Sequence, residues 1–123
     1  MLQSMNAEYF DWNDVESFVK DLLTLCKDRA YIGVYGIPRG GLVLATILSY
    51  RLRIPLLNAP SKGCLVVDDI ADSGDTLLHY DVKGYDIVTM CYKSTSKVKP
   101  MCYYKETTQW AVFPWEGGLD ESK

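Results

Sequence analysis

The stretch CLVVDDIADSGDTL, residues 64–77, joins two parts with opposite electrostatic preferences. An apolar run leads into the adjacent acids Asp68 and Asp69, whose ionised carboxylates only accept hydrogen bonds. After Asp72, residues 73–76 have the composition of a helix start, where free backbone amides and hydroxyls attract an anion. A sugar phosphate satisfies both parts, with its phosphate in the loop and its hydroxyls on the acids. The residues alone also allow Mg²⁺ on the paired acids, or acids that only cap a helix or end a strand in solvent.

The chain as a whole has the composition of one globular domain. It holds 123 residues, of which 48% are hydrophobic and 24% charged, so we expect a single domain over residues 1–123, with a mobile tail from residue 116. The net charge of −3 gives no general attraction to nucleic acid or to an anionic membrane. No apolar run approaches the ~20 residues that span a bilayer, and the first residues lack the features of a signal peptide. The four cysteines have no metal-binding spacing, which favours reduced thiols and a cytoplasmic location.

Strands and helices are predicted to alternate along the chain. The segment 12–29 has apolar residues on one helical face, and Asn13 and Glu16 have the spacing of a capping box. The run 64–67 has no polar alternation, which is typical of a strand covered on both faces. Further helices are expected at 40–53 and 74–81, and further strands at 31–36, 54–59, 85–93 and 101–106.

This alternation predicts an α/β fold with a parallel sheet and helices on both faces. In such sheets ligands bind beyond the carboxyl ends of the strands. The loops 36–41 and 68–76 both follow strands, so we expect them to face one cleft. A receiver-like or P-loop protein also places acids at a strand end, but the chain has no G-x-x-x-x-G-K-[ST] motif.

The segment VVDDIADSGDTL resembles the signature of the type I phosphoribosyltransferases, which bind 5-phosphoribosyl-1-pyrophosphate (PRPP) with Mg²⁺. The resemblance extends over roughly residues 9–117 and implies the Rossmann-like fold of that family. It implies that Asp68 and Asp69 hold the ribose hydroxyls, directly or through Mg²⁺. It also implies that the 5′-phosphate is wrapped by Ser73, Gly74, Asp75 and Thr76, with the Asp75 carboxylate directed away from the phosphate.

The loop GIPRGG, residues 36–41, is similar to the pyrophosphate loop of the same family. The resemblance implies a cis peptide between Pro38 and Arg39. Arg39 can form charge-assisted hydrogen bonds to pyrophosphate, and the amides of Gly40 and Gly41 can face the anion. Taken by itself, the loop is better explained as an ordinary turn with a helix-capping glycine; its pairing with the first motif favours the pyrophosphate loop.

The segment QWAVFPWE, residues 109–116, resembles the closing segment of bacterial xanthine-guanine phosphoribosyltransferases. The resemblance implies that Trp110 stacks on a purine, while main-chain groups of Ala111 and Val112 bond the purine edge. A Trp at this place is also compatible with a core or rim position.

Two further residues match base-binding positions of the 6-oxopurine members. Lys93 matches the Lys that donates to O6, which favours guanine, xanthine or hypoxanthine over adenine. Asp72 matches the acid beside N7 of the base, a candidate for proton exchange. Without the resemblance, a solvated Lys and a helix-capping Asp explain the same residues.

The sequence therefore predicts a Mg²⁺-dependent 6-oxopurine phosphoribosyltransferase of purine salvage, with PRPP and a purine base as substrates and a homodimer or tetramer as its assembly. The alternative is a non-catalytic regulatory protein that binds PRPP. The family inserts a long flexible hairpin between its second and third strands, whereas here only Asn58–Gly63 bridges the gap. Lys62 is the one cation of this bridge and a candidate to replace a contact of the missing lid.

Overall fold

The computed structural model describes residues 6–117. The predicted mobile tail therefore lies outside the described residues, except for Glu116 and Gly117. Within the described part, the helices are too short or too polar to cross a membrane. The helices are α2 (Trp12–Cys26), α3 (Leu42–Leu52), α4 (Asp75–Asp81) and the 3₁₀ turn η1 (Pro114–Glu116); the strands are β1 (Ala7–Tyr9), β2 (Val34–Gly36), β3 (Leu56–Leu57), β4 (Leu65–Ala71), β5 (Asp86–Tyr92), β6 (Cys102–Glu106) and β7 (Trp110–Val112).

The central sheet has five strands in the order β3-β2-β4-β5-β6, and every neighbouring pair is parallel. The parallel α/β fold predicted from the sequence is thus confirmed. β4 lies at the centre of the sheet, between β2 and β5. Its carboxyl end therefore lies next to the loops that follow both neighbours.

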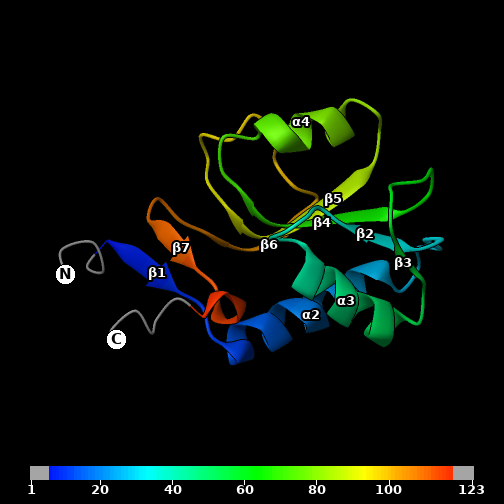
Figure 1. Cartoon of the computed structure of the whole chain (residues 1–123), viewed down its shortest axis with the longest axis horizontal. Helices are drawn as coiled ribbons and strands as arrows, with labels where there is room; N and C mark the ends of the chain where they lie inside the picture. Colours follow the sequence, from blue (N-terminus) through cyan, green and yellow to red (C-terminus); the bar gives the residue numbers. More distant parts are fainter. Residues whose placement is uncertain (1–5, 118–123) are drawn as a thin grey trace.

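Helices cover both faces of the sheet, as predicted (Figure 1). Successive side chains of a strand point to opposite faces, so neighbouring valines of β4 enter different cores. Val67 packs with Phe18 of α2 and Leu48 of α3. Val66 packs with Leu77 of α4 on the other face. The burial of these completely covered side chains supplies the main driving force for folding.

The start of α2 differs from the sequence prediction. Asp11 is the N-cap: its carboxylate accepts from the Asp14 amide, and the Asp14 carboxylate accepts from the Asp11 amide, both at 2.8 Å. The predicted capping box of Asn13 and Glu16 was therefore wrong, because the helix begins earlier. Glu16 instead accepts from Arg51 of α3 at 3.0 Å.

Strand β4 is longer than predicted. The expected strand 64–67 stops before the two acids, whereas β4 continues to Ala71 and contains both of them. The reason is the parallel ladder with β5, in which Asp68 pairs with Thr89 and Ile70 with Cys91. The alternation of the strand therefore directs Asp68 and Asp69 to opposite faces of the sheet.

A second, two-stranded sheet joins the ends of the described chain. β1 pairs in parallel with β7, with Ala7 opposite Trp110 and Tyr9 opposite Val112. This pair lies beside the main sheet, next to the start of α2 (Figure 1). β1 was not predicted from the sequence, because three residues are too few for a recognisable alternation.

No long hairpin separates β3 from β4, as predicted; only residues 58–64 connect them. The described cysteines are all unbridged thiols, again as predicted: Cys26, Cys64 and Cys91 are buried and Cys102 is half-buried.

Candidate active site

The loop 36–41 lies directly against the acids of β4. The peptide between Pro38 and Arg39 is cis, as predicted. A Cβ added at Gly40 would collide with the Asp69 carboxylate, and one at Gly41 would collide with the carbonyl of Val67. Both glycines therefore allow the backbone to approach β4 closely.

The amide of Gly41 does not face the cleft, contrary to the sequence prediction. It donates to the carbonyl of Ile37 at 2.8 Å, which closes the turn that starts α3. The Gly40 amide makes no hydrogen bond with any described residue, so it remains the one glycine donor of this loop for an anion.

A cleft of about 700 Å³ opens between this loop and the end of the chain. Arg39 and Asp69 both line it, so the structure brings together a predicted pyrophosphate residue and a predicted ribose residue. The complete lining is Arg39, Gly40, Leu42, Val43, Asp69, Trp115 and Glu116. We call it the larger cleft.

A smaller pocket of about 160 Å³ adjoins the larger cleft, because Asp69 and Glu116 line both. It contains four of the predicted base-site residues. Trp110 stands at its edge with 71% of its surface exposed, so the face of its ring is open to a ligand. The lining is Asp69, Ile70, Asp72, Lys93, Trp110, Ala111, Phe113 and Glu116. We call it the smaller pocket.

The backbone of β7 explains which of its residues can bond a ligand. Trp110 donates its amide to Asn6, and Phe10 donates to the carbonyl of Val112 at 2.9 Å, so these groups point toward β1. In a parallel pair the intervening residue points its amide and carbonyl the other way. The main-chain groups of Ala111 are thus directed away from β1. Val112 lines neither cavity and its carbonyl is bound by Phe10, so its predicted main-chain contact with the base was wrong.

Lys93 and Asp72 lie together in the smaller pocket, where Lys93 Nζ is 3.6 Å from an Asp72 carboxylate oxygen. The Lys93 side chain is only 19% exposed, and its amide donates to the carbonyl of Ala71. This backbone contact fixes the start of the Lys93 side chain beside the end of β4. The pair thus presents a donor and an acceptor side by side.

The two acids of β4 differ in environment. Burial, and then the negative charge of Asp69, raise the pKa of Asp68 to about 8. An Asp68 carboxylate oxygen also accepts from the Asp69 amide at 2.9 Å. Asp69 lines both cavities, whereas Asp68 lines neither. Asp69 is therefore the acid more open to a ligand.

The loop 73–76 is supported by the segment that follows Lys93. Gly74 has φ +85°, and a Cβ added there would lie 2.6 Å from the Lys97 amide nitrogen and from the Ser96 hydroxyl oxygen. The Lys97 amide donates to the carbonyl of Ser73 at 2.9 Å. Glycine is therefore required both for the conformation and for the close contact.

The carboxylate of Asp75 is bound by a cation. Lys97 Nζ lies 2.5 Å from it, and this hydrogen bond lowers the pKa of Asp75. The Asp75 amide donates to the Ser73 hydroxyl at 3.2 Å, while Thr76 is exposed in the first turn of α4. Sequence reasoning missed Lys97, because no local spacing connects it with residue 75.

Glu116 is the other residue that sequence reasoning missed. It lines both cavities together with Asp69, and its carboxylate accepts from the Phe113 amide at 2.8 Å. The described residues hold no cluster of three metal-ligand side chains. Two carboxylates nevertheless fit Mg²⁺, which usually takes one or two protein carboxylates and completes its shell with waters and substrate phosphates. Of the two predicted ligands, Asp69 lines both cavities and could hold it, whereas Asp68 lines neither; Glu116 is a further acid of the same cavities.

Lys62 lies near the amino ends of β4 and β5, away from the candidate active site. It lines a cavity with Cys64 and Asp86, which stand at the amino ends of β4 and β5, whereas Arg39 and Asp69 lie toward the carboxyl ends. The hypothesis that Lys62 replaces a contact of the lid was therefore wrong.

Comparisons with known proteins extend these observations. No protein-family model matches the chain. A xanthine-guanine phosphoribosyltransferase of Chromohalobacter salexigens is 24% identical over 88% of this chain and 83% of its own length. The solved structure of a purine phosphoribosyltransferase from Pyrococcus horikoshii superposes with a TM-score of 0.77 and 27% identity, over 89% of this chain and 93% of that one.

A further solved structure, the xanthine-guanine-hypoxanthine phosphoribosyltransferase of Helicobacter pylori, gives a TM-score of 0.72 at 21% identity. It is matched over 94% of this chain and 98% of its own. The parallel sheet, the position of both loops and these similarities agree with one another. The fold of this chain is therefore that of the type I phosphoribosyltransferases, and its sequence is similar to purine phosphoribosyltransferases over nearly its whole length.

Proposed function

We propose that this chain transfers the 5-phosphoribosyl group from PRPP to a 6-oxopurine, releasing pyrophosphate and a nucleoside 5′-monophosphate. The observation that carries this proposal is the pair of adjoining cavities that share Asp69 and Glu116. One has the cation and amide that pyrophosphate needs, and the other has the stacking ring and the donor that an oxopurine needs. A reaction between PRPP and a base requires two such sites side by side.

The larger cleft suits PRPP. Arg39 is exposed in this cleft and can bond pyrophosphate oxygens, while the free amide of Gly40 adds a donor. Asp69 accepts from the ribose hydroxyls, and Asp68, which remains largely protonated at neutral pH, can donate or accept. The loop 73–76 receives the 5′-phosphate. These contacts orient the ribose, and Arg39 stabilises the charge that develops on the leaving group.

The smaller pocket suits an oxopurine. The exposed ring of Trp110 offers a stacking face, and the main-chain groups of Ala111 point away from β1 and are available to the base edge. Lys93 donates to a keto oxygen but has nothing to offer an exocyclic amino group. Asp72, 3.6 Å from Lys93, can exchange a proton with a ring nitrogen.

Mg²⁺ is the expected cofactor, held by Asp69 with Glu116 and by the substrate phosphates. Its chemistry would be to neutralise charge on the leaving pyrophosphate. We place the metal on Asp69 rather than Asp68, because Asp69 lines both cavities and Asp68 lines neither.

The direct test is to incubate the protein with PRPP, Mg²⁺ and guanine, xanthine, hypoxanthine or adenine separately, and to detect nucleotide and pyrophosphate. We expect product with at least one oxopurine, none with adenine, and none when a chelator removes Mg²⁺. Equal turnover of adenine would contradict the base assignment.

The short connection 58–64 favours a second candidate, a regulatory protein that binds PRPP without transferring it. Tight PRPP binding with no nucleotide formed from any purine would establish that function instead. We also propose a homodimer or tetramer in the cytoplasm, which light scattering and fractionation would test.

A further inference from the structure

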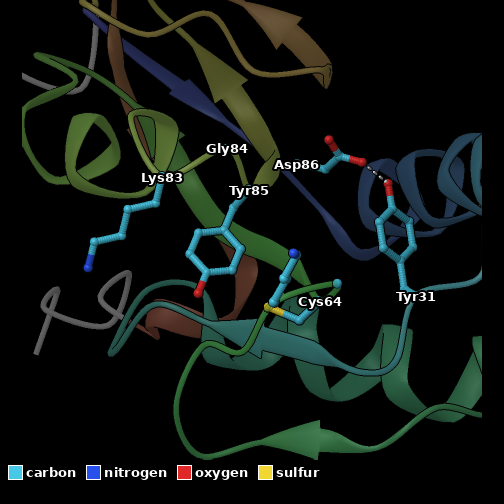
Figure 2. Close-up of a pocket in the computed structure, with 8 residues that line it drawn as sticks. Tyr31, Cys64, Lys83, Gly84, Tyr85 and Asp86 are labelled. Carbon is cyan, nitrogen blue, oxygen red and sulfur yellow. Dashed lines mark hydrogen bonds between the residues drawn. The ribbon is translucent and has the colours of Figure 1, made fainter.

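A separate cavity of about 460 Å³ lies at the amino ends of the strands, opposite the candidate active site. Figure 2 shows Tyr31 on one side of Cys64, and Tyr85 with Lys83 on the other. Cys64 directly precedes β4 and Asp86 begins β5, so the cavity marks the amino ends of these strands. None of its residues lines the larger cleft or the smaller pocket. The lining is Tyr31, Lys62, Gly63, Cys64, Lys83, Gly84, Tyr85 and Asp86.

The one acid of this cavity already has partners for its carboxylate. The Tyr31 hydroxyl donates to the Asp86 carboxylate at 2.6 Å (dashed in Figure 2), and Arg29 approaches the same carboxylate oxygen at 3.9 Å. Burial, followed by the hydrogen bond to Asp86, raises the pKa of Tyr31, so its proton stays on the hydroxyl. The Asp86 carboxylate is therefore bound by Tyr31 and lies close to Arg29.

The two lysines have no such partner. Neither Lys62 nor Lys83 forms an ion pair with any described residue, and the nearest polar contact of Lys83 is His79 Nε2 at 3.5 Å. Both side chains are exposed. The charge that this cavity offers to a ligand is therefore positive and comes from two separate segments of the chain.

The remaining walls leave room for an organic group. Tyr85 is half-buried and its ring is held by Tyr80, at 6.2 Å between ring centres. Gly63 and Gly84 have positive φ angles of 90° and 85° and no side chain, and nothing lies within 4 Å of a Cβ added at Gly84. The Tyr85 ring, which packs on Tyr80, thus lies in the same cavity as the unobstructed backbone of Gly84 and the two lysines.

We propose that this cavity is a binding site for a small phosphate monoester, whose phosphate lies between Lys62 and Lys83 and whose organic group packs on Tyr85. Lysine binds phosphate as a mobile point charge, and two lysines on different segments can converge on one dianion. Inorganic phosphate shares the same chemistry for the lysines but cannot use the aromatic wall. The two ligand types are therefore separable by affinity.

The test is a titration of the ¹⁵N-labelled protein with phenyl phosphate and, separately, with inorganic phosphate, followed by NMR. The amide signals of Gly63 and Gly84 report on this cavity, while those of Gly40 and Gly74 report on the candidate active site. We expect saturable shifts at Gly63 and Gly84 with phenyl phosphate, and weaker binding of inorganic phosphate at the same amides. The readout does not depend on catalysis, so it stands whether or not the proposed transfer occurs.

The variant Lys62→Ala/Lys83→Ala should bind phenyl phosphate at this cavity at least about tenfold more weakly, because both charge-assisted contacts are lost. The matched control is Lys20→Ala/Lys27→Ala, which removes two exposed lysines of α2 and its C-cap with the same change in net charge. Absence of saturable shifts at Gly63 and Gly84, or an equal loss in the control, would overturn the site. Equal affinity for both ligands would overturn the assignment to a monoester.

Discussion

At the scale of single residues, Asp68 and Asp69 show how one step along a strand changes the chemistry of a side chain. They are identical and adjacent, yet Asp69 lines both cavities while Asp68 lies buried enough for its pKa to rise to about 8. The difference follows from the alternation of β4, which sends the two side chains to opposite faces.

Replacing both acids tests the ribose site. Asp68→Asn/Asp69→Asn replaces the Asp69 carboxylate and the Asp68 carboxyl by neutral amides, which weakens the acceptor for the ribose hydroxyls and removes the Asp69 ligand for Mg²⁺. PRPP affinity should therefore fall by at least about tenfold, which corresponds to the loss of one charge-assisted hydrogen bond. Calorimetry measures this affinity, and circular dichroism establishes that the variant is folded. The exposed pair Asp21→Asn/Asp28→Asn is the charge-matched control. Unchanged affinity in a folded double variant would contradict the ribose assignment.

The raised pKa of Asp68 makes stability depend on pH. The folded chain binds the proton more tightly than the unfolded chain, whose Asp titrates near 3.8. This contribution is therefore fully present below about pH 4 and is lost as pH rises through about 8. Asp68→Asn should be more stable than the wild type at pH 8.5 by about 1 kcal/mol or more, and the difference should shrink toward pH 5. Urea denaturation at both pH values measures it; a difference that stays constant with pH would show that Asp68 ionises normally.

Lys93 tests the recognition of the base. Lys93→Ala removes the donor to a keto oxygen, so the preference for guanine over adenine in kcat/KM should fall roughly tenfold to 100-fold. PRPP affinity should change little, because Lys93 lines only the smaller pocket. Steady-state kinetics with both bases gives the ratio, with Lys20→Ala as control. If Lys93→Ala lost PRPP affinity but kept the guanine-to-adenine ratio of kcat/KM, Lys93 would have to be assigned to the PRPP site instead.

At the scale of elements, the segment after β5 supports the loop before α4. Lys97 donates its amide to Ser73 and its Nζ to Asp75, so residue 75 contributes little free negative charge beside the expected phosphate. Replacing Lys97 while keeping Asp75 would leave an unpaired carboxylate beside the site expected for the 5′-phosphate.

Lys97→Ala should therefore weaken PRPP binding about tenfold, whereas Lys97→Ala/Asp75→Asn should recover most of the affinity because the repulsion is gone. The free energy of unfolding should change little, since both side chains of the pair are more than half exposed. Calorimetry and denaturation supply the two readouts, and Lys99→Ala in the same segment is the control. A double variant no tighter than the single would show that Lys97 contacts the phosphate itself.

The sequence predicted the contiguous strand–loop–helix unit that contains Asp68 to Thr76, because its composition changes from apolar to acidic to helix-starting within a few residues. The role of these residues in binding PRPP stays a prediction. Lys97 and Glu116 could not be found in this way, because each reaches the site from a distant segment. The cap at Asp11 was missed because two neighbouring residues fit the capping pattern almost equally well. The amide of Gly41 was misassigned because a turn bond, not composition, decides its direction.

At the scale of the whole molecule, the short connection between β3 and β4 decides how well water is excluded. Residues 58–64 run from the carboxyl end of β3 to the amino end of β4, where Lys62 lines the cavity opposite the candidate active site. No described segment folds over the larger cleft as a hairpin would.

We therefore expect transfer to be accompanied by hydrolysis of PRPP, because water can compete with the base at an uncovered ribose. Hydrolysis should account for at least about a tenth of the PRPP consumed in a single turnover with saturating guanine. Quenched-flow separation of nucleotide from ribose 5-phosphate measures the partition, and the Asp68→Asn/Asp69→Asn variant gives the background. Transfer without detectable hydrolysis would mean that the cleft is covered by another copy of the chain.

The parallel pair of β1 and β7 makes β1 the support of a strand that lines the smaller pocket. Trp110 and Ala111 are held in place by a strand that is synthesised about a hundred residues earlier, so the smaller pocket is complete only when β7 has paired with β1. A nascent chain that still lacks β7 can already contain the loop 68–76 but not the aromatic edge of this pocket. Under the proposed function, an engineer who wants to alter purine choice without touching PRPP binding should begin with residues 7–9.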